Sequence, residues 1–211
     1  MSSFDSASSH STDLSGTWKL NTTLSDDAEH MLAERQREER EEYMKRRRQW
    51  ERAYPAEAPA PIDVDGSGSA RRNEPSPSRR ASIKRYQENL HKMLAISDTL
   101  TIRQAGSTVD ILSEVESRRM VAGSHTQVSM PEGELADSAV GWDGEWFVIE
   151  RSVRGGPHVI EKFRLVAKTA QLEYEMKWSG ESELAGMQIR RVFDRSTQAP
   201  PPADPAAGPT R

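Results

Sequence analysis

The side chains that most often do chemistry in proteins are sparse in this sequence. The chain has no cysteine, which excludes disulfides, thiolate nucleophiles and cysteine-bound metals. No GxSxG nucleophile motif and no convincing acid–base pair is present. The five histidines stand singly, without the spacing by which two rings share a metal ion: His10, His30, His91, His125 and His158. We therefore expect no metal, no cofactor and no catalytic residue, and the sequence does not favour an enzyme.

Aromatic and methionine side chains in the C-terminal half indicate a different kind of site. They fall at alternate positions of predicted strands, so that they share one face. The candidate lining residues are Trp142, Phe147, Ile149, Leu172, Tyr174, Met176 and Trp178. Aromatic rings and methionines offer an apolar ligand a large contact area and an adaptable shape. The same residues also fit a filled core, and the sequence leaves both interpretations open.

These residues need a packed core, and the composition shows where that core lies. Residues 98–195 contain 24 Leu, Ile, Val or Phe in 98 positions, whereas residues 22–97 contain 8 in 76. Only the first density can offset the entropy of ordering the chain. The net charge of −4, from 33 acidic and 29 basic residues, argues against a nucleic-acid partner. No run reaches the roughly 18 apolar residues of a membrane span.

The core segment reads as β-structure. Alternation of period two predicts strands over 99–104, 108–112, 145–153, 158–167, 171–178 and 187–193. Asp143-Gly144 is the strongest hairpin signal, because these residues accept the backbone of a two-residue turn. An isolated strand at 15–21 precedes them. The pattern predicts an all-β fold, an antiparallel meander barrel of about eight strands.

A long insertion separates the first two predicted strands. Its first part, 26–53, has 9 acidic and 8 basic residues, strong helix formers and no interior Gly or Pro, which favours an exposed helix. The predicted organisation is a disordered N-terminus over 1–13; a barrel over 14–21 and 98–195; an insertion over 22–97, with helix 26–53, disordered linker 55–78 and helix 80–96; and a disordered tail over 196–211.

Several short motifs resemble those of small bacterial lipocalin-like proteins, of the calycin type, whose function is unknown. They are LSGTWKLN, DTLTIRQAGSTVDI, GWDGEWFVIERS and IRRVFDRS, within residues 14–21 and 98–195. The resemblance implies that Trp18 of the first strand stacks on an arginine of the closing strand, Arg190 or Arg191. Alternation with Ile189 and Phe193 favours Arg191.

A closed barrel of about eight strands can hold one small ligand. The function expected is therefore non-catalytic binding of a small apolar or amphipathic molecule. The alternative is a protein-interaction module, in which helix 26–53 and the basic segment 71–92 contact a partner beside an inert barrel. The Ser-rich start lacks a basic region and an apolar run, which predicts a cytoplasmic protein, or a periplasmic one if an export signal is missing from this chain.

Overall fold

The computed structural model describes residues 4–6, 12–54, 94, 97–114, 116–129, 134–181 and 184–197. The chain divides into two compact units, residues 1–26 with 96–211, and residues 27–95. All described strands belong to the first unit and the long helix to the second. None of the helices in the described part combines the length and apolar character that a membrane span needs.

The first unit is a nearly closed antiparallel β-barrel, which confirms the predicted fold class. It has ten strands instead of about eight, and helix α1 (Ala28–Ala53) follows the first of them in the chain. The strands are β1 (Gly16–Leu20), β2 (Thr99–Ala105), β3 (Thr108–Ser113), β4 (Ser117–Val121), β5 (Ser124–Ser129), β6 (Leu135–Asp143), β7 (Trp146–Ser152), β8 (Pro157–Val166), β9 (Gln171–Gly180) and β10 (Gln188–Arg195). The sequence does not predict β4 and β5, because they contain too few apolar residues to alternate visibly.

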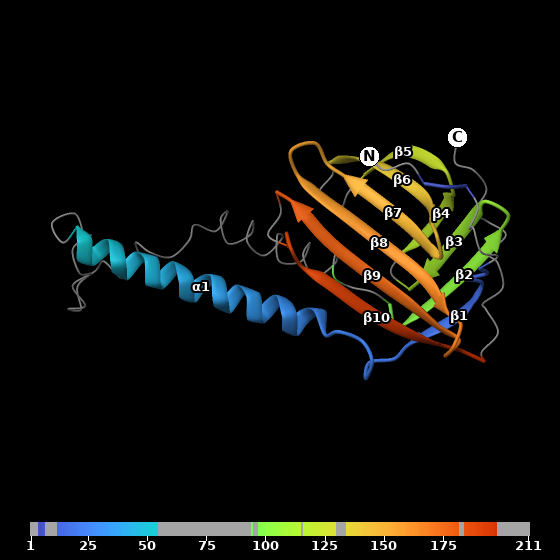
Figure 1. Cartoon of the computed structure of the whole chain (residues 1–211), viewed down its shortest axis with the longest axis horizontal. Helices are drawn as coiled ribbons and strands as arrows, with labels where there is room; N and C mark the ends of the chain where they lie inside the picture. The colour runs from blue at the N-terminus through green and yellow to red at the C-terminus, as the bar shows by residue number, and fades with distance from the viewer. Residues whose placement is uncertain are drawn as a thin grey trace. The chain divides into compact units, whose positions relative to one another are not determined.

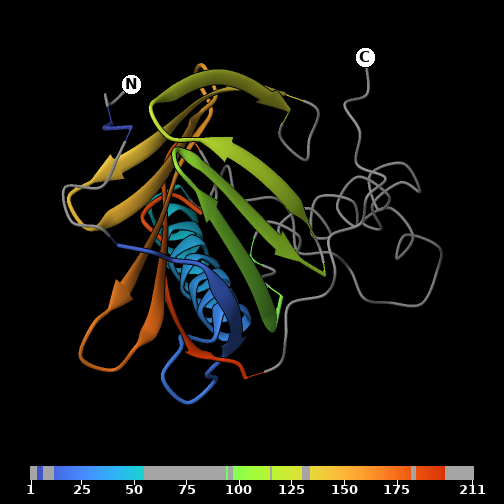
Figure 2. The same ribbon diagram turned by 90° about the vertical axis from the view of Figure 1, so that its right-hand side faces the viewer.

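All ten strands form one sheet, in the order β4-β3-β2-β1-β10-β9-β8-β7-β6-β5. The first strand pairs with the last, and β4 and β5 are the two edges. The sheet curls, so that β2–β4 (green) face β6–β9 (yellow to orange) in Figures 1 and 2. At the edges, the turn Ala122–Gly123 connects β4 to β5, and the Gly123 N–H donates to the Val140 carbonyl at 2.7 Å. The curl gives the sheet an inner face.

The inner face carries one cluster of buried apolar side chains from most of the strands. Its aromatic members pack in pairs: the Trp142 and Phe147 ring centroids are 5.3 Å apart, and those of Phe163 and Tyr174 are 4.8 Å apart. The cluster consists of Leu14, Trp18, Leu100, Ile102, Val109, Ile111, Ala122, Val140, Trp142, Phe147, Ile149, Phe163, Leu172, Tyr174 and Phe193. Most of it lies within the segment that the composition indicates as the core.

The β6–β7 hairpin differs by one residue from its prediction. Its turn residues are Gly144 and Glu145, because Asp143 pairs with Trp146 at the strand ends. Gly144 has a φ of +61°, and a positive φ at the first central position favours glycine. Trp142 therefore lies opposite Phe147, on the inner face.

The second unit contains α1, and the sequence explains both where this helix begins and what stabilises its surface. Asp27 caps the helix, and its carboxylate accepts from the His30 N–H at 3.0 Å. Pairs of opposite charge one turn apart support the exposed surface, including Arg35–Glu39 at 3.2 Å and Arg47–Glu51 at 2.8 Å. The predicted linker 55–78 and tail lie outside the described residues, except for 196–197, and of the predicted helix 80–96 only Leu94 is described.

The N-terminal segment corrects part of the expectation of disorder over 1–13. Asp5 forms a bridge with Trp142 of β6, donating to its carbonyl at 3.0 Å and accepting from its N–H at 2.8 Å. A Cβ at Gly141 would lie 2.6 Å from the Asp5 carbonyl oxygen. The glycine therefore leaves the space that this close approach requires.

Candidate ligand-binding site

Besides Arg195 at the end of β10, four charged side chains lie on the inner face of the barrel, among positions that hold mostly apolar residues. Residues directly opposite each other on antiparallel strands share a face of the sheet. The charged residues and their cross-strand partners are Arg118–Ile111, Arg151–Val159, Glu161–Ile149 and Arg191–Tyr174. Three of these four partners belong to the inner cluster. The inner face is therefore both aromatic and charged.

Glu161 on β8 is the centre of this charged group, and its side chain is 1% exposed. The Nη1 atom of Arg118 donates to both of its carboxylate oxygens at 3.0 Å, and Arg151 forms a second ion pair with it. The hydroxyl of Tyr174 donates to Glu161 Oε2 at 3.4 Å. Arg118 also pairs with Glu116 at the more exposed end of β4, at 3.3 Å. The buried Glu161 carboxylate thus forms ion pairs with two guanidinium groups, those of Arg118 and Arg151.

The electrostatics of the group are dominated by burial. Burial raises the pKa of the Tyr174 phenol to about 12, although the charges of Arg118, Arg191 and Arg151 act to lower it. Burial, and next the positive charge of Arg118, lower the pKa of Arg151 to about 10. The Nε of Arg151 is buried and has no hydrogen-bond partner among the described residues. The buried surroundings therefore disfavour the positive charge of the Arg151 guanidinium.

The seven candidate lining residues lie on neighbouring strands, β6, β7 and β9. Five of them belong to the inner cluster: Trp142, Phe147, Ile149, Leu172 and Tyr174. Met176 is partly buried and packs against the cluster. Trp178 is fully buried but lies outside it, near the end of β9, and its indole N–H has no partner among the described residues.

The arginine that contacts Trp18 is not one of the two expected. Arg195 lies over the Trp18 ring, with 4.5 Å between the guanidinium carbon and the ring centroid. The register explains this, because Trp18 is opposite Arg195. Arg191 lies four residues before Arg195 on β10, opposite Tyr174. Arg190 pairs with Glu173 on the outer face. The contact that the resemblance implies is present, with a different partner.

His158 joins two other side chains on the outer face. Its Nε2 is 2.8 Å from Glu150 Oε1, and its Nδ1 is 3.1 Å from Ser179 Oγ. A hydroxyl, an imidazole and a carboxylate in this order can activate a nucleophile. Here His158 and Ser179 are paired residues inside a continuous β-ladder, so the three side chains link β7, β8 and β9.

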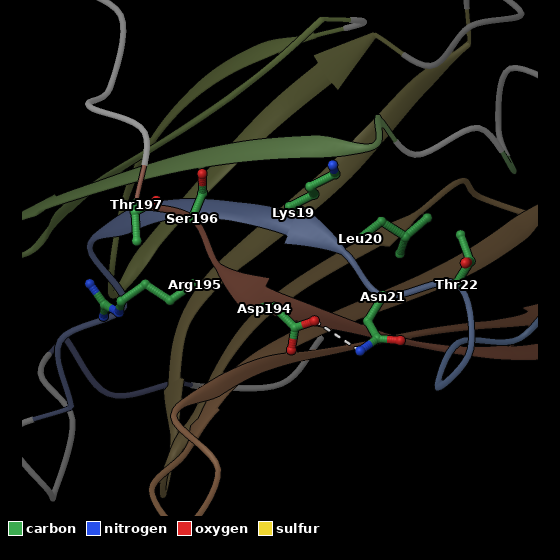
Figure 3. Close-up of a pocket in the computed structure, with 8 residues that line it drawn as sticks. All are labelled: Lys19, Leu20, Asn21, Thr22, Asp194, Arg195, Ser196 and Thr197. Carbon is green, nitrogen blue, oxygen red and sulfur yellow. Dashed lines mark hydrogen bonds between the residues drawn. The ribbon is translucent and has the colours of Figure 1, made fainter.

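A pocket of about 450 Å³ lies at the ends of β1 and β10. It is lined by Lys19, Leu20, Asn21, Thr22, Asp194, Arg195, Ser196 and Thr197. Figure 3 shows Lys19 and Arg195 pointing away from each other, and Asn21 donating to Asp194 at 2.8 Å. The two cations do not converge on one point, and this pocket is a weaker candidate than the inner face.

Arg118, Arg151 and Glu161 are not among the site residues that the sequence predicts. For two of them the signal was available. Arg151 and Glu161 occupy the apolar phase of predicted strands, on the same face as Ile149 and Phe163. For Arg118 the sequence offers no such indication, because its strand β4 has no apolar alternation.

The fold and site define a protein with a ten-stranded antiparallel β-barrel whose inner face combines an aromatic cluster with two arginines that share one buried carboxylate. No family model matches the chain, and no curated protein sequence does. Solved structures of lipid-binding proteins are weakly similar. Apo lipid binding protein 8 of Caenorhabditis elegans has a TM-score of 0.45 and 13% identity, over 88% of this chain and 99% of that one. The REP1-NXSQ fatty acid transporter has a TM-score of 0.45 and 15% identity, over 89% and 98%.

Proposed function

We propose that this protein binds a small amphipathic molecule inside the barrel, with an acidic group of the ligand against the inner arginines. The apolar part of the ligand would contact the inner cluster, including Trp142, Phe147 and Met176. The proposal rests on the chain's own side chains, since the similarities to solved structures are too low to indicate a ligand.

One observation carries the proposal, the imbalance of charge on the inner face. Arg118 and Arg151 lie there and share one buried carboxylate, Glu161, while Glu116, the other carboxylate that pairs with Arg118, is 55% exposed. The other buried carboxylates, Glu150 and Glu173, alternate onto the outer face. Buried cations are costly unless anions and hydrogen bonds compensate them. An acidic ligand would add a second buried carboxylate for these two arginines, since guanidinium groups bind carboxylates through strong charge-assisted hydrogen bonds.

The aromatic part of the inner face supports an apolar chain or ring on the same ligand. Ligand sites in proteins are mostly apolar, with a few polar groups that fix orientation. Trp142, Phe147 and Tyr174 supply large surfaces, and the partly buried Met176 supplies an unbranched side chain that adapts its shape. Arg118 and Arg151 would then place the acidic end of the ligand beside β4 and β7.

The test compares two ligands that differ only in the head group. Dodecanoate should bind and change the tryptophan fluorescence, with a Kd on the order of micromolar, and dodecanol should bind about tenfold or more weakly. Arg118→Gln should weaken dodecanoate binding toward the level of dodecanol. Arg119→Gln is the matched control, because Arg119 is the next residue, is 75% exposed and pairs with Asp110.

Three results would contradict the proposal. They are equal affinity for dodecanoate and dodecanol, equal loss of binding in Arg118→Gln and Arg119→Gln, and no binding of either ligand to the unmodified chain. Each variant is checked by its unfolding transition, so that loss of binding is not confused with loss of fold.

A further inference from the structure

Helix α1 has exposed aromatic side chains along one line of its surface. Tyr43 is 60% exposed, Trp50 42% and Tyr54, directly after the helix, 53%. Spacings of seven and four residues place them on the same face at 3.6 residues per turn. The Trp50 and Tyr54 rings contact each other, with centroids 6.0 Å apart. Large apolar side chains that gather on one exposed face are characteristic of interaction surfaces.

The charges of α1 are divided between its two halves. Residues 28–42 contain six acidic and three basic residues, a net charge of −3. Residues 43–53 contain five basic residues and one acidic residue, a net charge of +4. The division falls at Tyr43, near the middle of the helix. Such a helix is complementary in charge to a second copy of itself running in the opposite direction.

We propose that α1 pairs with α1 of a second copy of this chain, antiparallel, with Tyr43 facing Tyr43 of the other copy at the two-fold axis. The aromatic face continues through Gln36, Glu39 and Arg47, all within about 40° of the line of Tyr43 at 3.6 residues per turn. In this register Glu39 faces Arg47 of the second copy, and Gln36 faces Trp50. Leu32 and Ala28 are already buried within one copy, so the pairing begins after them.

Three features favour this occupant over an unrelated partner. The acidic and basic halves match only in the antiparallel direction, which fixes the orientation of the pair. Positions on the aromatic face are spaced equally in both directions from Tyr43, as self-complementary binding requires. The Arg35–Glu39 and Arg47–Glu51 pairs within each helix hold the charged groups near the positions at which the second copy would meet them.

Single cysteines test the register, because the natural chain has none. Tyr43→Cys in the full chain should give a disulfide-linked dimer on mild oxidation, since a residue at a two-fold axis meets its own copy. Arg48→Cys is the matched control, because position 48 lies on the opposite side of the helix and should remain monomeric on denaturing gels. Equal cross-linking of the two variants, or of neither, would overturn the proposal.

Charge exchange tests the pairing itself. Sedimentation of the full chain should show a dimer that weakens between about 0.05 M and about 1 M salt, as the Debye length falls to about 3 Å. Glu39→Arg alone should be monomeric, as should the double variant Arg46→Glu with Arg47→Glu. Mixing the two should restore a dimer, because each reversed charge then meets its opposite. A monomeric unmodified chain, or a mixture that stays monomeric while circular dichroism shows intact helices, would refute the antiparallel pair.

Discussion

Arg118 on the edge strand β4 and Glu161 on β8 face each other across the barrel, with Arg118 Nη1 3.0 Å from both carboxylate oxygens. The pair joins an edge of the sheet to a strand six positions away in the sheet order. Because β4 is bonded by a strand on one side only, this pair is a main contact between that edge and the opposite wall. Its carboxylate is also the group with which an acidic ligand would compete for arginine.

Glu161→Gln should strongly destabilise the protein. It leaves Arg151 inside the barrel without its carboxylate and Arg118 with only the exposed Glu116, and removing one member of a buried ion pair costs about 3–5 kcal/mol. Urea unfolding followed by tryptophan fluorescence measures the loss. Glu175→Gln, on the outer face of β9, is the control and should change the free energy of unfolding by about 0.5 kcal/mol or less. A Glu161→Gln variant as stable as the parent would show that the pair contributes nothing.

The same variant separates stability from binding. If Glu161 competes with the ligand for the two arginines, Glu161→Gln should bind dodecanoate more tightly than the unmodified chain, and dodecanol no differently. The ligand should also raise the unfolding midpoint of the variant more than that of the parent. Tighter binding of both ligands would instead indicate a looser barrel.

The arginine on Trp18 gives a prediction about the first strand. Arg195→Ala should cost about 0.5–1 kcal/mol, because the guanidinium over the buried Trp18 ring is itself exposed. Gly16→Ala should cost more, about 1–3 kcal/mol, since a Cβ there would lie 3.0 Å from Arg195 Nη1 and the φ of +153° is rare outside glycine. Thermal or urea unfolding checks the order. Arg119→Ala, at an exposed ion pair elsewhere, should be nearly neutral.

The sequence predicts this fold well because apolar alternation or turn residues indicate eight of the ten strands. It fails at β4 because the inner positions of that strand hold Arg118 and Met120, so the inner face there has no apolar pattern. The missing strand and the missed site residue therefore have one cause. A strand with charged residues at its inner positions has no hydrophobic alternation by which it could be predicted. Once the register is known, the same charged residues indicate the site.

The choice of arginine for Trp18 could not be made from alternation. Arg191 and Arg195 fall on the same phase of β10, so both point to the inner face. What separates them is the stagger between β1 and β10, which places Trp18 at the end of β10. Stagger depends on how the whole sheet closes, and no local pattern records it.

Glu173 gives a prediction about pH. Burial acts to raise the pKa of this carboxyl, but hydrogen bonds from Arg190 and Arg164 outweigh it, so the pKa lies below the ordinary value of 4.5. A carboxyl with a lowered pKa in the folded state stabilises the fold above its ordinary pKa, and that contribution is lost as the pH falls through the lowered value. Glu173→Gln should therefore be less stable at neutral pH by about 1–2 kcal/mol. The difference between variant and parent should shrink below about pH 4.5. A gap that is constant with pH would contradict this role.

Met176 gives the prediction that separates a ligand site from a filled core. It lies opposite Glu161 and Ile189, and it is only partly buried against the inner cluster. If a ligand occupies the space beside it, Met176→Trp should abolish dodecanoate binding and leave the free energy of unfolding nearly unchanged. In a tightly packed core the larger ring would instead cost about 1–3 kcal/mol through overpacking. Met176→Leu keeps the volume and should retain both binding and stability. A destabilised Met176→Trp variant, in a chain that binds no dodecanoate, would leave the barrel as a scaffold and α1 as the functional surface.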